Sequence, residues 1–251
     1  MRYFAEFEYN GANYHGWQFQ PNAISVQEVM EKGISMLLRQ HTPLTAAGRT
    51  DTGVHAKKMY AHFDTVAPID DLELFAFKLN GIMPEDIAIH WVVRVTDDAH
   101  ARFDATGRTY EYWLTQKKSA FTDKLVTRTY FQLDFDRMND ACEVLLEEKD
   151  FASFCKAHTD VKTTFCDVRK AYWRQAENTP DTWIFTIEAD RFLRNMVRAT
   201  VGTLIEIGRG HLNKEDLRRI LHEKSRCSAG QSMPADGLYL VDITYPERIF
   251  I

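Results

Sequence analysis

The sequence predicts an α+β fold with two similar α/β subdomains, in which helices flank a largely antiparallel, mixed central sheet. Two observations favour this class. In residues 3–9, apolar and aromatic side chains at every second position alternate with Phe4, Glu6 and Glu8, and this period of two is typical of a strand. Later segments place apolar residues at helical spacing after capping signals, and strand-like and helix-like segments alternate. A catalytic cleft is expected where the two subdomains meet over the sheet.

The first half of the chain contains segments in the order β, α, β, loop, β, α, β. The opening strand ends in the turn Asn10-Gly11-Ala12-Asn13. Ser25-Val26-Gln27-Glu28 has the form of a capping box, and apolar residues then share one helical face, so a helix is expected from Val26 to Gln40. The other expected elements are strands at 44–46 and 59–64, a helix opened by Asp70 and Asp71 that runs to Leu79, and a buried strand at 87–95.

A polar hinge at residues 96–100 predicts a domain boundary near residue 100. It would separate an N-terminal α+β domain, residues 1–100, from a C-terminal α+β domain, residues 101–251. The second domain opens with a β-rich segment at 108–116. Helices are expected there at 136–148 and 191–207.

The chain has 251 residues, 45% of them hydrophobic, which is enough for a substantial core. No stretch approaches the ~20 apolar residues of a membrane span, and the acidic N-terminus lacks the apolar run of a signal peptide. A cytoplasmic protein without membrane contact is therefore expected.

The formal net charge of −5 argues at first against a nucleic-acid partner, because neutralising phosphates requires concentrated positive charge. Local clusters of lysine and arginine could nevertheless form a positively charged cleft on a protein that is acidic overall. The simpler explanation is that these residues are solvated surface charges. The clusters are Arg102, Arg108, Lys117, Lys118, Lys124 and Arg128, and then Arg191, Arg194, Arg198 and Arg209.

Residues 48–56 predict a loop that presents Asp51. Gly48 and Gly53 flank it and provide backbone freedom, and Arg49 could keep the carboxylate ionised or bind a phosphate. An ionised, accessible aspartate is a nucleophile or a base. The alternative is a simple turn in which Asp51 only bonds nearby backbone amides.

Arg108-Thr109-Tyr110 suits an unstacked nucleobase, since Tyr110 can stack on the base while an arginine binds phosphate. Strand tyrosines are more often packing residues, so both explanations remain open. Arg198 lies among apolar residues of an expected helix, where an unpaired arginine would be costly to bury. A carboxylate partner is expected for it, and Asp51 is one candidate.

Other chemistries are disfavoured. Asp51-Thr52-Gly53 matches the aspartic-protease triplet, but that chemistry needs two carboxylates and the chain has one copy. Cys155, His158 and Cys166 could be imagined as metal ligands, yet a structural zinc site needs four with paired short spacings. No metal is expected, and the cysteines are expected to be reduced.

Together these residues resemble the TruA-type tRNA pseudouridine synthases, nearly from end to end. The stretch Gly-Arg-Thr-Asp-x-Gly-Val-His at 48–55 is the most specific part of the match. Two positions depart from the family pattern, Asn10 where Asp is usual and Met233 where Ala is usual. The other matching segments are residues 9–11, 14–18, 79–81, 100–103, 108–110, 150–154, 192–198 and 237–240.

The resemblance implies isomerisation of uridine to pseudouridine in the anticodon stem-loop of tRNA, without cofactor or metal, by a homodimer in which one tRNA contacts both subunits. Asp51 would be the nucleophile, or would remove a sugar proton, so that the glycosidic bond breaks and the uracil rejoins through carbon. Arg198 would pair with Asp51, and Arg49 would occupy the space of the displaced nucleotide. Tyr110 would stack on the flipped base, and Leu238 would pack against it. The competing hypothesis is a non-catalytic RNA-binding module in which Asp51 is replaceable.

Overall fold

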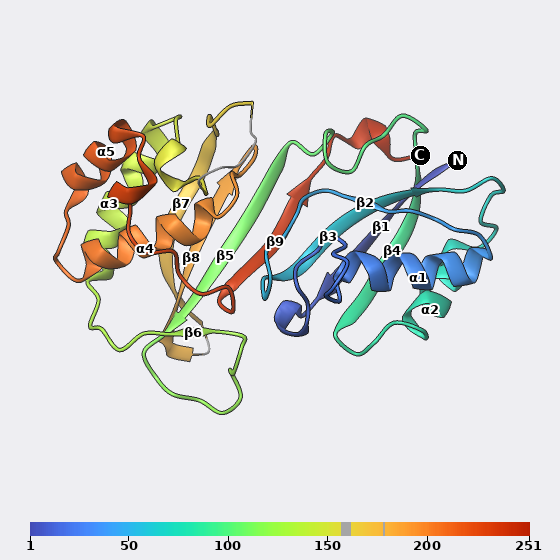
Figure 1. The fold of residues 1–251 in the computed structure, drawn as a ribbon, viewed down its shortest axis with the longest axis horizontal. Helices are drawn as coiled ribbons and strands as arrows, with labels where there is room; N and C mark the ends of the chain where they lie inside the picture. The colour runs from blue at the N-terminus through green and yellow to red at the C-terminus, as the bar shows by residue number, and fades with distance from the viewer. Residues whose placement is uncertain (157–161, 178) are drawn as a thin grey trace. The chain divides into compact units, whose positions relative to one another are not determined.

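The structure is a computed structural model that describes residues 1–156, 162–177 and 179–251 (Figure 1). Within these residues the chain forms five α-helices and nine strands in mixed order, and most strand pairs are antiparallel. The predicted α+β class is confirmed. The chain divides into two compact units, Met1–Gly107 together with Tyr239–Ile251, and Arg108–Leu238.

The first unit is built on strands in the order β4-β1-β3-β9, with β2 paired to β3. β1 runs antiparallel to both β3 and β4, whereas β9 pairs in parallel with β3. Two of these strands, β1 and β3, are almost entirely buried and form the centre of the core. The bounds are β1 Arg2–Tyr9, β2 Thr45–Ala46, β3 His55–Asp64, β4 Ile87–Val95 and β9 Leu238–Thr244.

Two helices, α1 (Val26–Leu38) and α2 (Leu72–Asn80), pack against each other in this unit, and α2 also packs on β4. Both begin where their capping residues predict. The Ser25 hydroxyl accepts the Glu28 N–H at 3.3 Å, and the Asp71 carboxylate accepts the Leu74 N–H at 2.8 Å. α1 ends at a left-handed Arg39, just before the expected end at Gln40.

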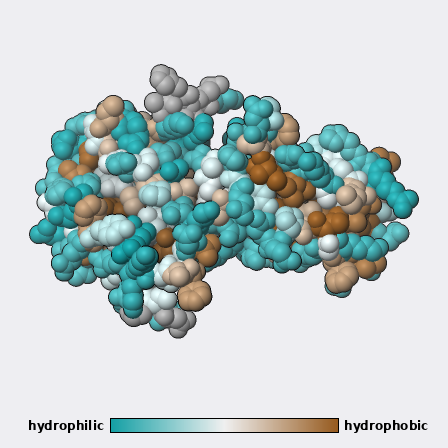
Figure 2. Space-filling view, turned by 60° about the horizontal axis from the view of Figure 1, so that its bottom comes forward, coloured by the Kyte–Doolittle hydropathy of each residue, from teal (hydrophilic) through white to brown (hydrophobic). Residues whose placement is uncertain are grey.

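Apolar residues are exposed on the first unit, and brown, apolar surface is visible in Figure 2. On or beside α1 and α2 the exposed large apolar side chains are Ile24, Met36, Leu74, Phe77 and Ile82. None of the helices formed by the described residues has the length and apolar character that crossing a membrane requires.

The second unit contains the antiparallel strands β5-β8-β7, and β6 pairs in parallel with β5. α3 packs against β7 and against the helices α4 and α5. A 3₁₀ turn at Ala152–Phe154 fills the space beside α4 and α5. The bounds are β5 Gly107–Thr115, β6 Thr127–Arg128, α3 Phe135–Glu147, β7 Val168–Ala176, β8 Thr179–Ala189, α4 Met196–Gly208 and α5 Lys214–Glu223.

The two compact units differ from the division expected near residue 100. The change of unit falls at Gly107, and residues 239–251 group with the first unit. The reason is strand pairing, because Tyr239 and Leu240 of β9 pair with His55 and Ala56 of β3.

His62 is a buried imidazole on β3. Its Nδ1 accepts the N–H of Ala101 at 3.1 Å, and its ring meets that of His100 edge-on with centroids 4.7 Å apart. Burial, helped by the positive charge of Arg2, lowers the pKa of His62 to about 4. The folded protein therefore holds this side chain neutral at a pH where an ordinary histidine is protonated.

The free energy of unfolding is expected to fall as the pH drops below ~6.5, the ordinary pKa of histidine. Between that pH and the folded pKa of about 4, the unfolded chain binds a proton that the folded chain excludes. The contribution of His62, about 3 kcal/mol, is complete above pH ~6.5 and is lost near pH 4. Denaturant titrations of the wild type and His62→Asn between pH 7 and 4 measure it, because asparagine keeps an acceptor but does not titrate. Equal pH dependence in the two proteins would contradict the assignment.

Candidate active site

Asp51 lies in the loop between β2 and β3 and is half-exposed, as the sequence predicted. Its neighbour Thr50 is buried, and the Thr50 hydroxyl shares a 2.8 Å hydrogen bond with the hydroxyl of Tyr9. The Asp51 carbonyl accepts the N–H of Val54 at 3.1 Å, which closes a tight turn through Gly53 at φ 79°. The expectation of special backbone freedom at Gly48 is wrong, since positive φ in this loop occurs only at Gly53.

Residues 14–17 hold the Asp51 loop on both sides. The N–H of Trp17 donates to the Thr50 carbonyl at 3.2 Å, and the N–H of Gly53 donates to the Tyr14 carbonyl at 3.3 Å. Between these bonds Gly16 adopts φ 87°, and a Cβ placed there would lie 2.5 Å from the Thr50 carbonyl oxygen. Only a glycine allows this approach. Residues 14–17 therefore position the backbone on which Asp51 is carried.

A second contact joins the following residues of the loop to the 3₁₀ turn Gly11–Asn13. The Gly11 N–H donates to Nδ1 of the buried His55 at 3.0 Å. The His55 ring stacks on Tyr239 at 4.6 Å, and the Lys57 ammonium lies 5.3 Å from the Tyr239 centroid. In the sequence, Gly11 and His55 stand out only as residues shared with the family pattern. Their role could not be read from spacing, because it depends on contacts between segments distant in sequence.

Asn10, one of the two departures from the family pattern, caps this 3₁₀ turn. Its side-chain oxygen accepts the N–H of Ala12 at 3.1 Å. An aspartate carboxylate could accept the same bond, so the substitution preserves the local structure.

Arg49 is exposed, two residues before Asp51. Within the part of the chain that the structure describes, its guanidinium has no hydrogen-bond or ion-pair partner. An arginine in this state retains all five N–H donors for an anionic ligand such as a phosphate.

Tyr110 lies on β5 of the second unit, opposite Ile187 of β8, and is half-exposed. Its ring meets Phe192 edge-to-face with centroids 5.0 Å apart. Tyr112, two residues along the strand, is fully buried and bonds the Thr127 hydroxyl and the Pro234 carbonyl. Tyr110 therefore combines a fixed ring with an accessible surface, whereas Tyr112 is a core residue.

The predicted helix from residue 191 is wrong at its start. α4 begins at Met196, and Asn195 before it adopts a left-handed backbone at φ 69°. The Asp190 carboxylate accepts the N–H groups of Arg191 and Asp167, which directs the chain away from a helix. Of Arg191, Arg194 and Arg198, which all fall within the predicted helix, only Arg198 belongs to α4.

Arg198 is half-buried, not deeply buried as expected. Its Nε donates to the Met233 carbonyl at 2.6 Å, and the Met233 N–H donates to the Arg198 carbonyl at 3.1 Å. Because both bonds use the Met233 backbone, the departure from the usual Ala at this position leaves them possible. The predicted ion pair of Arg198 with Asp51 would join residues of different units, and it stays a prediction.

Leu238 begins β9 and is buried, with 6% of its surface exposed. Just before it, the Asp236 carboxylate accepts the Thr127 hydroxyl at 2.7 Å, and the Gly237 carbonyl accepts the Trp113 N–H at 2.8 Å. These contacts position the segment that leads to Leu238. A base-packing role for its side chain stays a prediction.

The described residues contain no group of three or more His, Cys, Asp or Glu side chains that could hold a metal. His158, one of the three ligands weighed for a zinc site, lies outside the described residues. Cys142, Cys155 and Cys166 are buried thiols, and burial raises the pKa of Cys142 and Cys166 to about 12. These two thiols are protonated at neutral pH and are poor ligands and nucleophiles.

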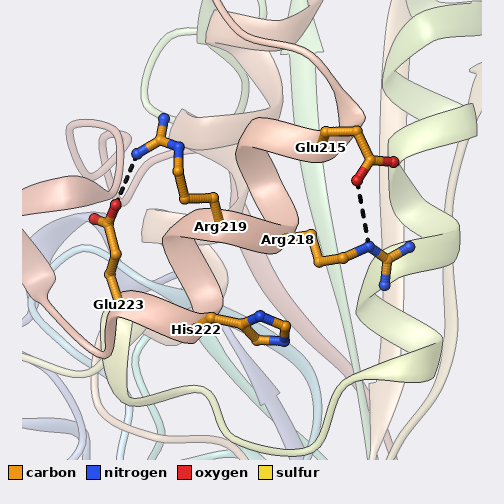
Figure 3. Close-up of a pocket in the computed structure, with 5 residues that line it drawn as sticks. All are labelled: Glu215, Arg218, Arg219, His222 and Glu223. Carbon is orange, nitrogen blue, oxygen red and sulfur yellow. Dashed lines mark hydrogen bonds and ion pairs between the residues drawn. The ribbon is translucent and has the colours of Figure 1, made fainter.

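A shallow pocket of about 410 Å³ lies on α5, and none of the predicted site residues lines it (Figure 3). Its side chains neutralise one another or nearby groups. Arg219 pairs with Glu223 at 2.8 Å, Arg218 with Glu147 at 2.8 Å, and His222 with Glu148 at 3.0 Å. A network of exposed ion pairs explains the pocket without a ligand.

Comparison with known proteins adds an independent finding. A family model described as tRNA pseudouridine synthase matches residues 141–246. Proteins named tRNA pseudouridine synthase A are similar along nearly the whole chain. The protein of Parabacteroides distasonis is 53% identical over 249 residues, covering 99% of this chain and 98% of the relative. That of Bacteroides fragilis is 51% identical over 250 residues, with 100% and 98% covered, and that of Porphyromonas gingivalis is 48% identical over 253 residues, with 100% and 99% covered.

Proposed function

Because this chain belongs to the tRNA pseudouridine synthase family, we propose that its Asp51 carboxylate starts the conversion of uridine to pseudouridine in the anticodon stem-loop of tRNA. The protein is an isomerase that acts on tRNA. The observation that supports the role of Asp51 is its half-exposed position in a loop held on both sides by backbone bonds from Trp17 and Tyr14. A nucleophile or base must be fixed and accessible at once.

The experiment that tests this function uses unmodified tRNA transcripts. One carries uridines in the anticodon stem-loop, and its matched control carries cytidines at those positions. Pseudouridine-specific detection should find product only in the first transcript. Product at uridines elsewhere would contradict the anticodon stem-loop assignment, and tRNA binding without any product would support the non-catalytic RNA-binding module instead.

Two arginines are proposed to act on the displaced nucleotide and on the carboxylate. Arg49 has its guanidinium donors available and would occupy the space of the flipped nucleotide or bind its phosphate. Arg198 is oriented by its bond to the Met233 carbonyl and would keep Asp51 ionised through its positive charge. Leu238 would pack against the base, and the hydrogen bonds of Asp236 and Gly237 would hold its backbone in place.

Tyr110 is proposed to stack on the flipped base. Tyr110→Ala is expected to lower kcat/KM for pseudouridine formation by about 100-fold, because stacking contributes ~1–3 kcal/mol per base. Tyr110→Phe retains the ring and should keep most of the activity. Circular dichroism should show that both variants are folded. Loss of the folded signal in Tyr110→Ala would instead favour a packing role, as its contact with Phe192 allows.

The protein is further proposed to be a cytoplasmic homodimer in which one tRNA contacts both subunits. Each chain carries a net charge of −5, and a basic surface shared by two chains would offset it locally. Recognition would then depend on shape and phosphates more than on base sequence, and affinity would fall steeply with salt.

A further inference from the structure

Residues 117–131 of the second unit, here called the 117–131 segment, form a basic and aromatic surface that the proposed site does not use. The segment follows β5, forms the long green loop in Figure 1 and ends just after β6. Its aromatic residues are exposed, Phe121 by 94%, Tyr130 by 80% and Phe131 by 47%. It carries one carboxylate, Asp123, and four cations, Lys117, Lys118, Lys124 and Arg128. The segment is therefore positive in a chain that is negative as a whole.

An arginine guanidinium stacks on each of two of these aromatic rings. The Arg128 guanidinium lies 4.5 Å from the ring centroid of Tyr130. The guanidinium of Arg209, the first residue after α4, lies 3.8 Å from the ring centroid of Phe131. Stacking uses the face of a guanidinium and leaves the N–H donors at its edge directed outward. Arg209 also pairs with Glu206 at 2.8 Å. The pair of Arg128 and Tyr130 therefore offers both an aromatic surface and donors suited to a phosphate.

Backbone hydrogen bonds to β5 hold the end of the segment. Thr127 and Arg128 pair with Leu114 and Thr115 of β5, and the N–H of Thr129 donates to the Thr115 carbonyl at 2.9 Å. Thr127 and Thr129 are buried, so the alternation of a strand turns Arg128 and Tyr130 outward. A surface fixed before binding loses little conformational entropy when a ligand arrives.

The segment lies near the proposed base-stacking residue but is separate from it. Tyr110 and Thr115 are on the same strand, five residues apart, which corresponds to ~17 Å. That is about half the ~34 Å of one double-helical turn. A tRNA with its target base at Tyr110 would bring neighbouring nucleotides within reach of Arg128 and Tyr130.

We propose that the 117–131 segment is a second tRNA-binding surface, in which Tyr130 stacks on an unpaired base and Arg128 binds a backbone phosphate. This inference rests on the proposed function, because it takes tRNA as the ligand. The surface contributes affinity and not chemistry, since its groups lie a strand's length from Tyr110.

The test measures the dissociation constant of unmodified tRNA by fluorescence anisotropy over a range of salt concentrations. Tyr130→Ala should weaken binding about tenfold, and Tyr130→Phe should bind like the wild type, because stacking needs the ring and not the hydroxyl. Arg128→Gln should also weaken binding and should reduce the slope of log Kd against log salt by about one, the loss of one phosphate contact. At saturating tRNA, all three variants should form pseudouridine at the wild-type rate.

Two matched controls separate this surface from exposed residues in general. Arg219→Gln removes an exposed arginine that is already paired with Asp216 and Glu223. Phe77→Ala removes a ring that is 75% exposed on α2 of the first unit, one helical turn after Glu73. Both controls should bind tRNA with wild-type affinity.

The outcomes distinguish this surface from the catalytic proposal. Wild-type affinity in Tyr130→Ala and Arg128→Gln would overturn the second surface and leave the isomerase intact. Weaker binding in those variants, with no product from the wild type, would support the surface and overturn the proposed function. Sedimentation velocity tests whether the variants bind more weakly because their oligomeric state has changed. Such a change would identify the segment as a subunit contact and overturn the proposal.

Discussion

Replacing Asp51 with asparagine is expected to lower the rate of pseudouridine formation on the order of 10⁴-fold or more, the scale seen when a catalytic group that acts first is removed. An amide is neither a useful nucleophile nor a base. Asparagine has nearly the same shape, and the turn itself is closed by the backbone bond from Val54 to the Asp51 carbonyl, so the loop should persist. Affinity for tRNA should change by less than about threefold, because phosphates supply most of the binding energy.

The measurement compares single-turnover rates and tRNA dissociation constants for the wild type and Asp51→Asn. Asp70→Asn is a matched control, since Asp70 is an exposed carboxylate in the same unit, outside the loop. It should behave like the wild type. A wild-type rate in Asp51→Asn would show that the carboxylate is dispensable, and it would remove the main support for a catalytic loop at residues 48–55.

Gly16→Ala is expected to impair catalysis although residue 16 carries no reactive group. The added Cβ would lie 2.5 Å from the Thr50 carbonyl oxygen and 3.1 Å from the Asp51 carbonyl carbon, both backbone atoms that must move to admit it. The φ of 87° is strained for alanine as well, at a cost of about 1–2 kcal/mol. A shift of ~1 Å in a reacting group can reduce the rate ~100-fold, and a loss of that size is expected in kcat.

Gly48→Ala, in the loop that Gly16 contacts, is the control for Gly16→Ala. A Cβ at residue 48 would meet no atom within 4 Å, and Gly48 does not have positive φ. This variant should retain both activity and melting temperature, whereas Gly16→Ala should lose activity and melt a few degrees lower. Equal kcat in the two variants would show that the contact of residues 14–17 with the loop does not position Asp51.

Local signals in the sequence predicted much of the fold. Ser25 and Asp71 each place a side-chain acceptor over the first turn of a helix, and α1 and α2 begin where these residues predict. Such signals are sufficient to predict a helix start when the contacts that determine it are made between residues close in sequence. α5 was missed although Asn213 and Asp216 form a complete capping box, a signal that was available at that point.

The predictions from sequence were wrong where contacts between distant segments determine the local structure. A helical pattern at 191–195 was outweighed by the carboxylate of Asp190, which bonds Arg191 and Asp167 and so links two distant segments. The burial expected for Arg198 was inferred from its apolar neighbours in sequence, but the bond to Met233 determines its position. The motif at 48–55 predicted an accessible Asp51, and no pattern in it indicated that residues 14–17 hold the loop.

The bonds between residues 14–17 and 50–53 also have a kinetic consequence. More than thirty residues separate the two segments, so bringing them together requires closing a large loop of chain, and this closure costs entropy before any contact stabilises it. We therefore expect the Asp51 loop to acquire its shape only after β1, α1 and β3 have assembled. A peptide containing the signature motif alone would lack the catalytic conformation, and the recovery of activity during refolding should follow the docking of the N-terminal residues.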